Sequence, residues 1–176
     1  MERPELESKL KIALDVFLDQ HRLLLDLDAS ERSIAHKFAE CLGHLFSAWN
    51  IDCEYNRHKN QEKRLLQVKK YVRDKRSRGE LTDKEEDFGV CVSPDAIVHE
   101  RATDASNLLV VEIKKTGHPL DEKEYDFLKI RNYISEIGYH YGLYLEFGVK
   151  DDAGMKKALL FLPDSAEPED ITQVLG

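Results

Sequence analysis

The sequence predicts an α/β domain with a mixed central sheet flanked by helices, and two patterns lead to this prediction. Amphipathic helical spacing covers residues 4–26, a segment that follows Asp28, and residues 121–136. Short apolar runs typical of strands lie between and after these helices, at residues 51–56, 90–100, 108–115, 139–147 and 157–162. Helices and strands therefore alternate along most of the chain, which favours the α/β class.

The first two helices are predicted from their apolar stripes. In the first stripe the apolar positions include Leu10, Leu14 and Phe17, and this helix is expected to pack on the core or on a second subunit. Asp28 is expected to cap the next helix. The stripe of that second helix comprises Ile34, Phe38, Cys41, Leu42, Leu45, Phe46 and Trp49.

The length and composition fit one domain that spans residues 1–176, with an N-terminal helix within 1–27 and a charged insertion at 57–87. Three widely spaced cysteines without a CxxC pair indicate neither a disulfide framework nor a zinc site. The start of the chain is charged, and no apolar run approaches the roughly 18 residues needed to span a bilayer. We therefore expect a cytoplasmic protein without a membrane partner.

The most informative residues are Asp95, Glu112 and Lys114, which are charged residues set within apolar runs. Alternate side chains of a strand share a face, so Glu112 and Lys114 should point the same way and Ile113 into the core. A hairpin through the polar loop 101–107 would bring Asp95 near Glu112. Alternatively, Asp95 begins a strand or turn, and Glu112 and Lys114 form an exposed cross-strand ion pair.

Two carboxylates a few Å apart repel each other unless one is protonated or a cation lies between them. Hard oxygen ligands select Mg²⁺ or Mn²⁺, and the carbonyl group of Ile113 could add a ligand to those of Asp95 and Glu112. A metal in this place lowers the pKa of a bound water, while Lys114 orients the nucleophile and offsets negative charge in the transition state. This chemistry is suited to hydrolysis of a phosphodiester.

The pattern Pro94-Asp95, a gap, then Glu112-Ile113-Lys114 resembles the PD-(D/E)XK nuclease superfamily. The resemblance implies a restriction-endonuclease-like core over residues 28 to about 162. It also implies an acidic residue on a helix before the first core strand, and Glu31 occupies that place. Asp126 and Lys129 resemble a polar pair that some relatives carry on the helix after the lysine strand. The alternative for Glu31 is a helix-capping role in the pattern Asp28-x-x-Glu31.

The net charge of −8 argues against a nucleic-acid partner, but the charge is unevenly distributed. Residues 57–79 contain ten Lys or Arg against two acidic residues, a local charge of +8. Backbone phosphates would bind most naturally to the residues in the middle of this run. The residues expected to bind nucleic acid are Lys69, Lys70, Arg73, Lys75 and Arg76. A charged helix and loop facing solvent would explain the same run without a ligand.

Together these observations predict a Mg²⁺- or Mn²⁺-dependent nuclease with Asp95 and Glu112 as metal ligands, Glu31 completing the site and Lys114 positioning water. The resemblance implies DNA rather than RNA as substrate, with products that carry a 5′-phosphate and a 3′-hydroxyl. Two alternatives remain open. One is a nucleic-acid-binding or adaptor subunit that keeps the fold without turnover, and the other is a junction resolvase acting as a homodimer. A protein partner is also compatible with the sequence.

Overall fold

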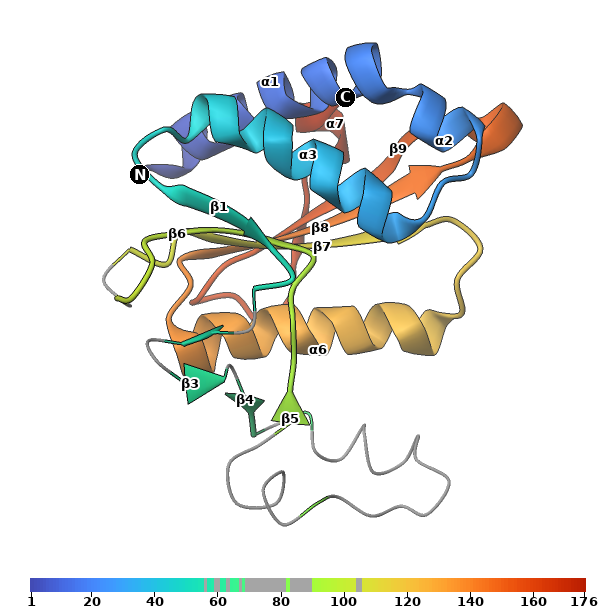
Figure 1. Ribbon diagram of the computed structural model, residues 1–176. Coiled ribbons are helices and arrows are strands. Elements are labelled where there is room, and N and C mark those ends of the chain that lie inside the picture. The colour runs from blue at the N-terminus through green and yellow to red at the C-terminus, as the bar shows by residue number, and fades with distance from the viewer. Residues whose placement is uncertain are drawn as a thin grey trace.

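Among the residues that the structure describes, helices cover both faces of a six-stranded mixed sheet (Figure 1). The computed structural model describes residues 1–55, 57–58, 61–62, 64–66, 68, 82, 90–103 and 106–176. Most of the charged insertion at 57–87 lies outside this set. The five residues expected to bind nucleic acid also lie outside it: Lys69, Lys70, Arg73, Lys75 and Arg76. The predicted α/β class, mixed sheet and flanking helices are confirmed.

The strands of the sheet follow the spatial order β1-β6-β7-β8-β9-β10. In chain order they are β1 (Asn50–Cys53), β6 (Ala96–His99), β7 (Leu109–Lys115), β8 (Tyr141–Gly148), β9 (Gly154–Phe161) and β10 (Glu169–Asp170). β7 and β8 are parallel, and the other neighbouring pairs are antiparallel. Two small ribbons lie outside this sheet, β2 (Arg57–His58) with β3 (Gln61–Glu62), and β4 (Arg64–Leu65) with β5 (Val90–Cys91). β7 is therefore an interior strand.

Three helices lie on one face of the sheet, namely α1 (Arg3–His21), α2 (Leu23–Asp26) and α3 (Glu31–Leu45). The long helix α6 (Leu120–Ile137) covers the other face (Figure 1). A short turn η1 (Lys150–Asp152) joins β8 to β9, and α7 (Thr172–Leu175) ends the chain beside α1. The sheet is thus the middle of three layers.

A hydrophobic core fills the space on each side of the sheet because alternate strand residues face opposite ways. On the side of α1 and α3, Val111 and Ile113 of β7 pack in the same cluster as Phe17 and Phe38. On the side of α6, Val110 of β7 packs in a second cluster, with Ile97, Ile130 and Tyr133. Even-numbered residues of β7 therefore face α6, and this includes Glu112 and Lys114.

The predicted strand at 90–100 is two strands, because Pro94 interrupts it. Proline has no backbone N–H to donate to a ladder, and β5 ends at Cys91 before β6 begins at Ala96. Asp95 consequently lies one residue before β6 rather than inside a strand. The predicted helix at 4–26 is likewise divided into α1 and α2.

The predicted cap of α3 is wrong. Ser30, not Asp28, is the N-cap, and its hydroxyl accepts the backbone N–H of Ser33 at 3.2 Å. Asp28 has a positive φ of 53° and lies before the helix, where its carboxylate pairs with Lys115 and Lys150. Asp28 therefore links the α2–α3 turn to the end of β7 and to η1.

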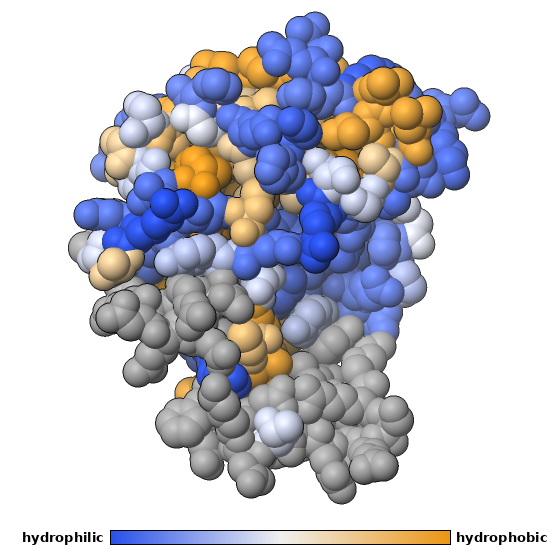
Figure 2. All heavy atoms as spheres, in the orientation of Figure 1, coloured by the Kyte–Doolittle hydropathy of each residue, from blue (hydrophilic) through white to orange (hydrophobic). Residues whose placement is uncertain are grey.

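The surface in the orientation of Figure 1 is largely hydrophilic across α3, and apolar side chains gather towards the α2 end (Figure 2). Leu23 and Leu27, at the two ends of α2, are exposed there. In the part of the chain that the structure describes, no helix combines the length and the hydrophobicity required to cross a membrane.

Candidate functional site

The predicted site residues meet where β7 ends, beside the beginnings of α3 and α6 (Figure 1). Glu112 and Lys114 lie on β7, Glu31 opens α3, and Asp95 comes directly before β6, the antiparallel neighbour of β7. In open α/β sheets, ligands bind preferentially beyond the carboxyl ends of parallel strands. The cluster occupies that position for the parallel pair β7 and β8.

Glu112 is the most deeply buried of these residues, with only 1% of its surface exposed. Its Oε2 accepts a hydrogen bond from Lys129 Nζ at 2.6 Å, whereas its Oε1 has no hydrogen-bond partner. Burial raises the pKa of this carboxyl well above its ordinary value, and the charges of Asp95 and Asp126 raise it further, while Lys129 opposes the shift. The alternative of an exposed cross-strand ion pair with Lys114 is excluded by this burial.

Asp95 lies against the same strand. Its Oδ2 accepts the backbone N–H of Ile113 at 2.7 Å, so the expected proximity of Asp95 and Glu112 is realised. Burial raises the pKa of Asp95, and the N–H of Ile113 partly offsets that effect. Ile113 itself packs in the core on the side of α1 and α3.

Lys114 lies between two carboxylates from opposite layers of the protein. Its Nζ is 3.3 Å from Glu31 Oε2 and 3.2 Å from Asp126 Oδ2. Burial acts to lower the pKa of Lys114, but the charges of Asp126 and Glu31 outweigh burial, and the pKa is raised overall. Lys114 is therefore an ammonium group at neutral pH, which can donate hydrogen bonds and cannot serve as a base.

Glu31 points from the first turn of α3 into the cluster. Besides Lys114, its carboxylate accepts the backbone N–H of Lys115 at 3.0 Å and lies 3.0 Å from His118 Nε2. Lys115 points away from Lys114 and donates from Nζ to Asp28 Oδ1 at 2.7 Å. The structure thus brings Glu31 and Asp126 to Lys114, whereas Glu112 pairs with Lys129 and Asp95 accepts the N–H of Ile113.

α6 supplies residues whose role the sequence indicates only weakly. Lys129 Nζ lies 2.6 Å from Glu112 Oε2 and 3.0 Å from Asp126 Oδ1. Burial alone would lower the pKa of Lys129, but Glu112 and Asp126 raise it overall, so Lys129 is positively charged at neutral pH. The i, i+3 spacing of Asp126 and Lys129 on a helix that follows the motif strand is the sequence signal for this pair.

Two further contacts at the edge of the cluster have weaker sequence signals. His118 follows β7 in the turn Gly117-His118-Pro119 and bridges Glu31 to Glu122, whose Oε2 is 2.7 Å from Nδ1. Glu146 of β8 is buried beside Lys123, with Oε1 at 2.8 Å from Nζ. A histidine directly after the motif strand is a visible signal, whereas the pairing of Glu146 depends on the register of β8.

The charge and oxygen content of the cluster fit a divalent cation. Four carboxylates, Glu31, Asp95, Glu112 and Asp126, face two ammonium groups, Lys114 and Lys129, which leaves a formal charge of −2. Carboxylate oxygens are the donors that Mg²⁺ and Mn²⁺ prefer. In the residues described, however, no three His, Cys, Asp or Glu side chains are already arranged around a metal position. One oxygen each of Glu112 and Asp126 is bound to Lys129, which would compete with a metal for these two carboxylates.

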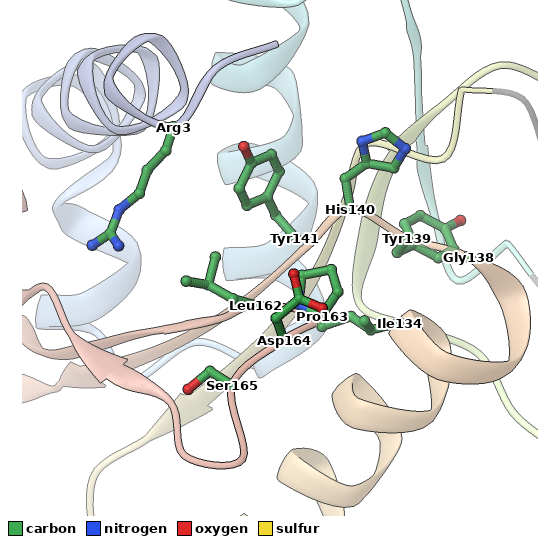
Figure 3. Close-up of a pocket in the computed structure, with 10 residues that line it drawn as sticks. All are labelled: Arg3, Ile134, Gly138, Tyr139, His140, Tyr141, Leu162, Pro163, Asp164 and Ser165. Atoms are coloured by element: carbon green, nitrogen blue, oxygen red, sulfur yellow. The ribbon is translucent and has the colours of Figure 1, made fainter.

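A separate open hollow of about 670 Å³ lies at the opposite end of β8, between the end of α6 and residues 162–165 (Figure 3). Arg3 lines it but is paired with Glu7 and Glu169, and the hydroxyl of Tyr141 donates to the carbonyl of Met1. None of the predicted site residues lines this hollow. The charged cluster, not this hollow, is the candidate for chemistry.

Comparison of the chain with protein-family models, with curated proteins and with solved structures found no match in any of the three. A functional proposal therefore depends on the motif in the sequence and on the geometry and charge of the cluster.

Proposed function

We propose that the chain is a cytoplasmic, metal-dependent nuclease with a restriction-endonuclease-like core of the PD-(D/E)XK type. The observation that carries the proposal is the convergence of Glu31, Asp95, Glu112 and Lys114 at the end of β7. These residues come from three separate parts of the chain, namely α3, the turn before β6, and β7. Burying charged side chains costs free energy of folding, and ionisable groups with shifted pKa values cluster at functional sites. A site that binds a divalent cation and a phosphodiester would account for all four side chains.

Asp95 and Glu112 would hold Mg²⁺ or Mn²⁺, with Glu31 and the carbonyl group of Ile113 as further ligands. When bound, the metal supplies Lewis acidity and a water of lowered pKa. Lys114, held as an ammonium by Asp126 and Glu31, donates a hydrogen bond that orients the attacking water. The same positive charge offsets the negative charge that develops on the phosphoryl oxygens.

The substrate we propose is DNA, with attack at phosphorus that leaves a 5′-phosphate and a 3′-hydroxyl. This preference follows from the resemblance of the motif. The basic run that contains Lys69, Lys70 and Arg73 would bind the phosphate backbone of the substrate.

Cleavage of labelled DNA tests the proposal most directly. Single-stranded, duplex and branched DNA, with RNA beside them, are incubated with the wild-type protein and with Lys114→Ala in Mg²⁺, Mn²⁺ or EDTA. We expect metal-dependent cutting that falls about 10²- to 10³-fold in Lys114→Ala. Lys37→Ala is the matched control, because Lys37 is an exposed lysine of α3 paired only with surface residue Glu40. Equal cutting by wild type and Lys114→Ala would reject the assigned role of Lys114.

One observation favours a second candidate, a binding or adaptor subunit without turnover. Lys129 lies 2.6 Å from Glu112 and already neutralises a carboxylate that a metal would need. The same experiment separates the two candidates. Binding of a nucleic acid without cutting in either metal would support the subunit and contradict the nuclease.

A further inference from the structure

Two buried carboxylate oxygens in the cluster have no hydrogen-bond partner. Within the ranges that the structure describes, they are Glu112 Oε1 and Asp126 Oδ2, and their residues are 1% and 2% exposed. Buried polar atoms of folded proteins almost always have a partner, and each exception calls for an explanation such as a missing ion. These two exceptions occur in the same cluster, on β7 and α6.

The other oxygen of each carboxylate binds one shared ammonium group. Lys129 Nζ lies 2.6 Å from Glu112 Oε2 and 3.0 Å from Asp126 Oδ1. Asp126 Oδ2 is 3.2 Å from Lys114 Nζ, close enough for ion pairing but without a hydrogen bond. Glu112 and Asp126 thus converge on Lys129. Among the described residues, the second oxygen of Glu112 has no hydrogen-bond partner, and the second oxygen of Asp126 has none beyond its ion pair with Lys114.

We propose that Asp126 is a further ligand of the divalent cation, and that Lys129 is an internal counter-ion that holds the place of the cation until it binds. This inference rests on the proposed function, because it concerns the same metal site. It explains why the carboxylates are turned towards Lys129 and no three of the described acidic side chains are already arranged around a metal position. It also assigns a role to Glu112 Oε1 and Asp126 Oδ2, the two oxygens without a hydrogen bond.

Lys129 also lies near an aromatic ring. Its four-carbon stem is flexible, and the ring of Tyr125 lies 5.4 Å from Nζ. The face of an aromatic ring attracts an ammonium group. If a metal ion displaced Lys129 from Glu112 and Asp126, Lys129 would keep this ring as a partner and remain charged.

The proposal makes opposite predictions for two variants. Asp126→Asn removes a ligand charge, so its affinity for the cation should fall at least about 10-fold. Lys129→Met removes the competing cation and keeps the length of the side chain, so its affinity should rise, by roughly 10-fold or more. If Lys129 only supported the fold or positioned the ligands, Lys129→Met would weaken cation binding instead.

Isothermal titration with MnCl₂ and MgCl₂ measures these affinities on the full chain without reference to cleavage. The titrations include wild type, Asp126→Asn, Asp126→Glu, Lys129→Met and Asp95→Asn, with Glu124→Gln as control because Glu124 is exposed on the same helix. Asp126→Glu keeps the carboxylate and should bind more tightly than Asp126→Asn. Circular dichroism of each metal-free variant verifies its fold, and Lys129→Met provides a test in which Asp126 is native.

The outcomes separate this inference from the proposed function. If Asp95→Asn abolishes binding but Asp126→Asn binds within twofold of wild type, Asp126 is not a ligand and the nuclease proposal stands. A weaker affinity in Lys129→Met rejects the counter-ion role. If wild type binds neither metal, the proposed metal site and this inference both fail.

Discussion

Asp95 and Ile113 are joined by a hydrogen bond in which the backbone N–H of Ile113 donates to Asp95 Oδ2 over 2.7 Å. This bond fixes the start of β6 against the residue that lies between Glu112 and Lys114. An asparagine at position 95 can accept the same bond through its side-chain oxygen but carries no charge. Asp95→Asn therefore separates the metal-binding role of Asp95 from its structural role.

We expect Mg²⁺ or Mn²⁺ to raise the melting temperature of the wild-type protein and not that of Asp95→Asn. At a metal concentration of about 100 Kd, the stabilisation is about 2.7 kcal/mol, or about 5 to 10 °C for a chain of this size. The metal-free melting temperature should not fall, because burial already disfavours the charged form of Asp95. Differential scanning fluorimetry measures both values. Asp19→Asn, on an exposed part of α1, is the control, and an undiminished metal shift in Asp95→Asn would remove Asp95 from the site.

The pH dependence of metal affinity follows from the direction of two pKa shifts. Burial raises the pKa of both Glu112 and Asp95, so the metal-free protein retains protons that the metal must displace. Affinity should therefore increase as pH rises above the ordinary carboxyl range, with release of protons on binding. In the metal-free protein the same groups lose protons on unfolding, so they reduce stability as pH rises.

Titration calorimetry at several pH values, in pairs of buffers with different heats of ionisation, counts the released protons. A proton count of zero together with an affinity that is constant between about pH 5.5 and pH 8 would show that both carboxyls are already ionised before metal binds. That result would contradict the direction of the shifts.

If the basic run at residues 57–79 binds DNA, the affinity for DNA should depend on salt concentration through these residues. Replacing Lys69, Lys70, Arg73, Lys75 and Arg76 by Gln should weaken binding to all DNA sequences alike. The slope of log affinity against log salt concentration should become shallower by up to about 4.5. Fluorescence anisotropy across a salt series measures both effects. Lys37→Gln with Lys156→Gln, two lysines paired with acidic neighbours on the surface, serves as control. Unchanged affinity and slope would assign the run to a solvent-facing segment.

The side-chain directions on β7 could be predicted from sequence because they depend only on the two-residue period of a strand. Glu112 and Lys114 face one side and Ile113 the other, as that period requires. The place of Glu31 near the lysine was predicted from the order of the motifs. The fold class followed from the alternation of helical and strand patterns.

The partners of these residues could not be predicted because they depend on packing between distant elements. Glu112 is neutralised by Lys129, which lies 17 residues later in another layer of the fold. Neither the helical nor the strand periodicity of the sequence predicts that contact. Aspartate is a residue type typical of helix caps, but the ion pairs of Asp28 with Lys115 and Lys150 determine its position. Ser30 then takes the capping role.

The position of α6 over the sheet depends on Gly142 of β8. A β-carbon at this position would lie 2.1 Å from Ile130 Cγ2 and 3.2 Å from Phe161 Cβ. Ile130 is β-branched and buried, so it cannot rotate away without cost. Ile130 directly follows Lys129, and a displacement of α6 at this point would also disturb the Lys129–Glu112 contact.

We expect Gly142→Ala to reduce the free energy of unfolding by about 1 to 3 kcal/mol. Ile130→Ala alone should cost about 2 to 5 kcal/mol, because it leaves a cavity. The double variant should cost less than the sum of the two single variants, since the new methyl group occupies space that Ile130 has vacated. Urea denaturation of the four proteins completes the cycle. Additive costs would mean that residues 142 and 130 do not compete for space and that α6 is positioned by other contacts.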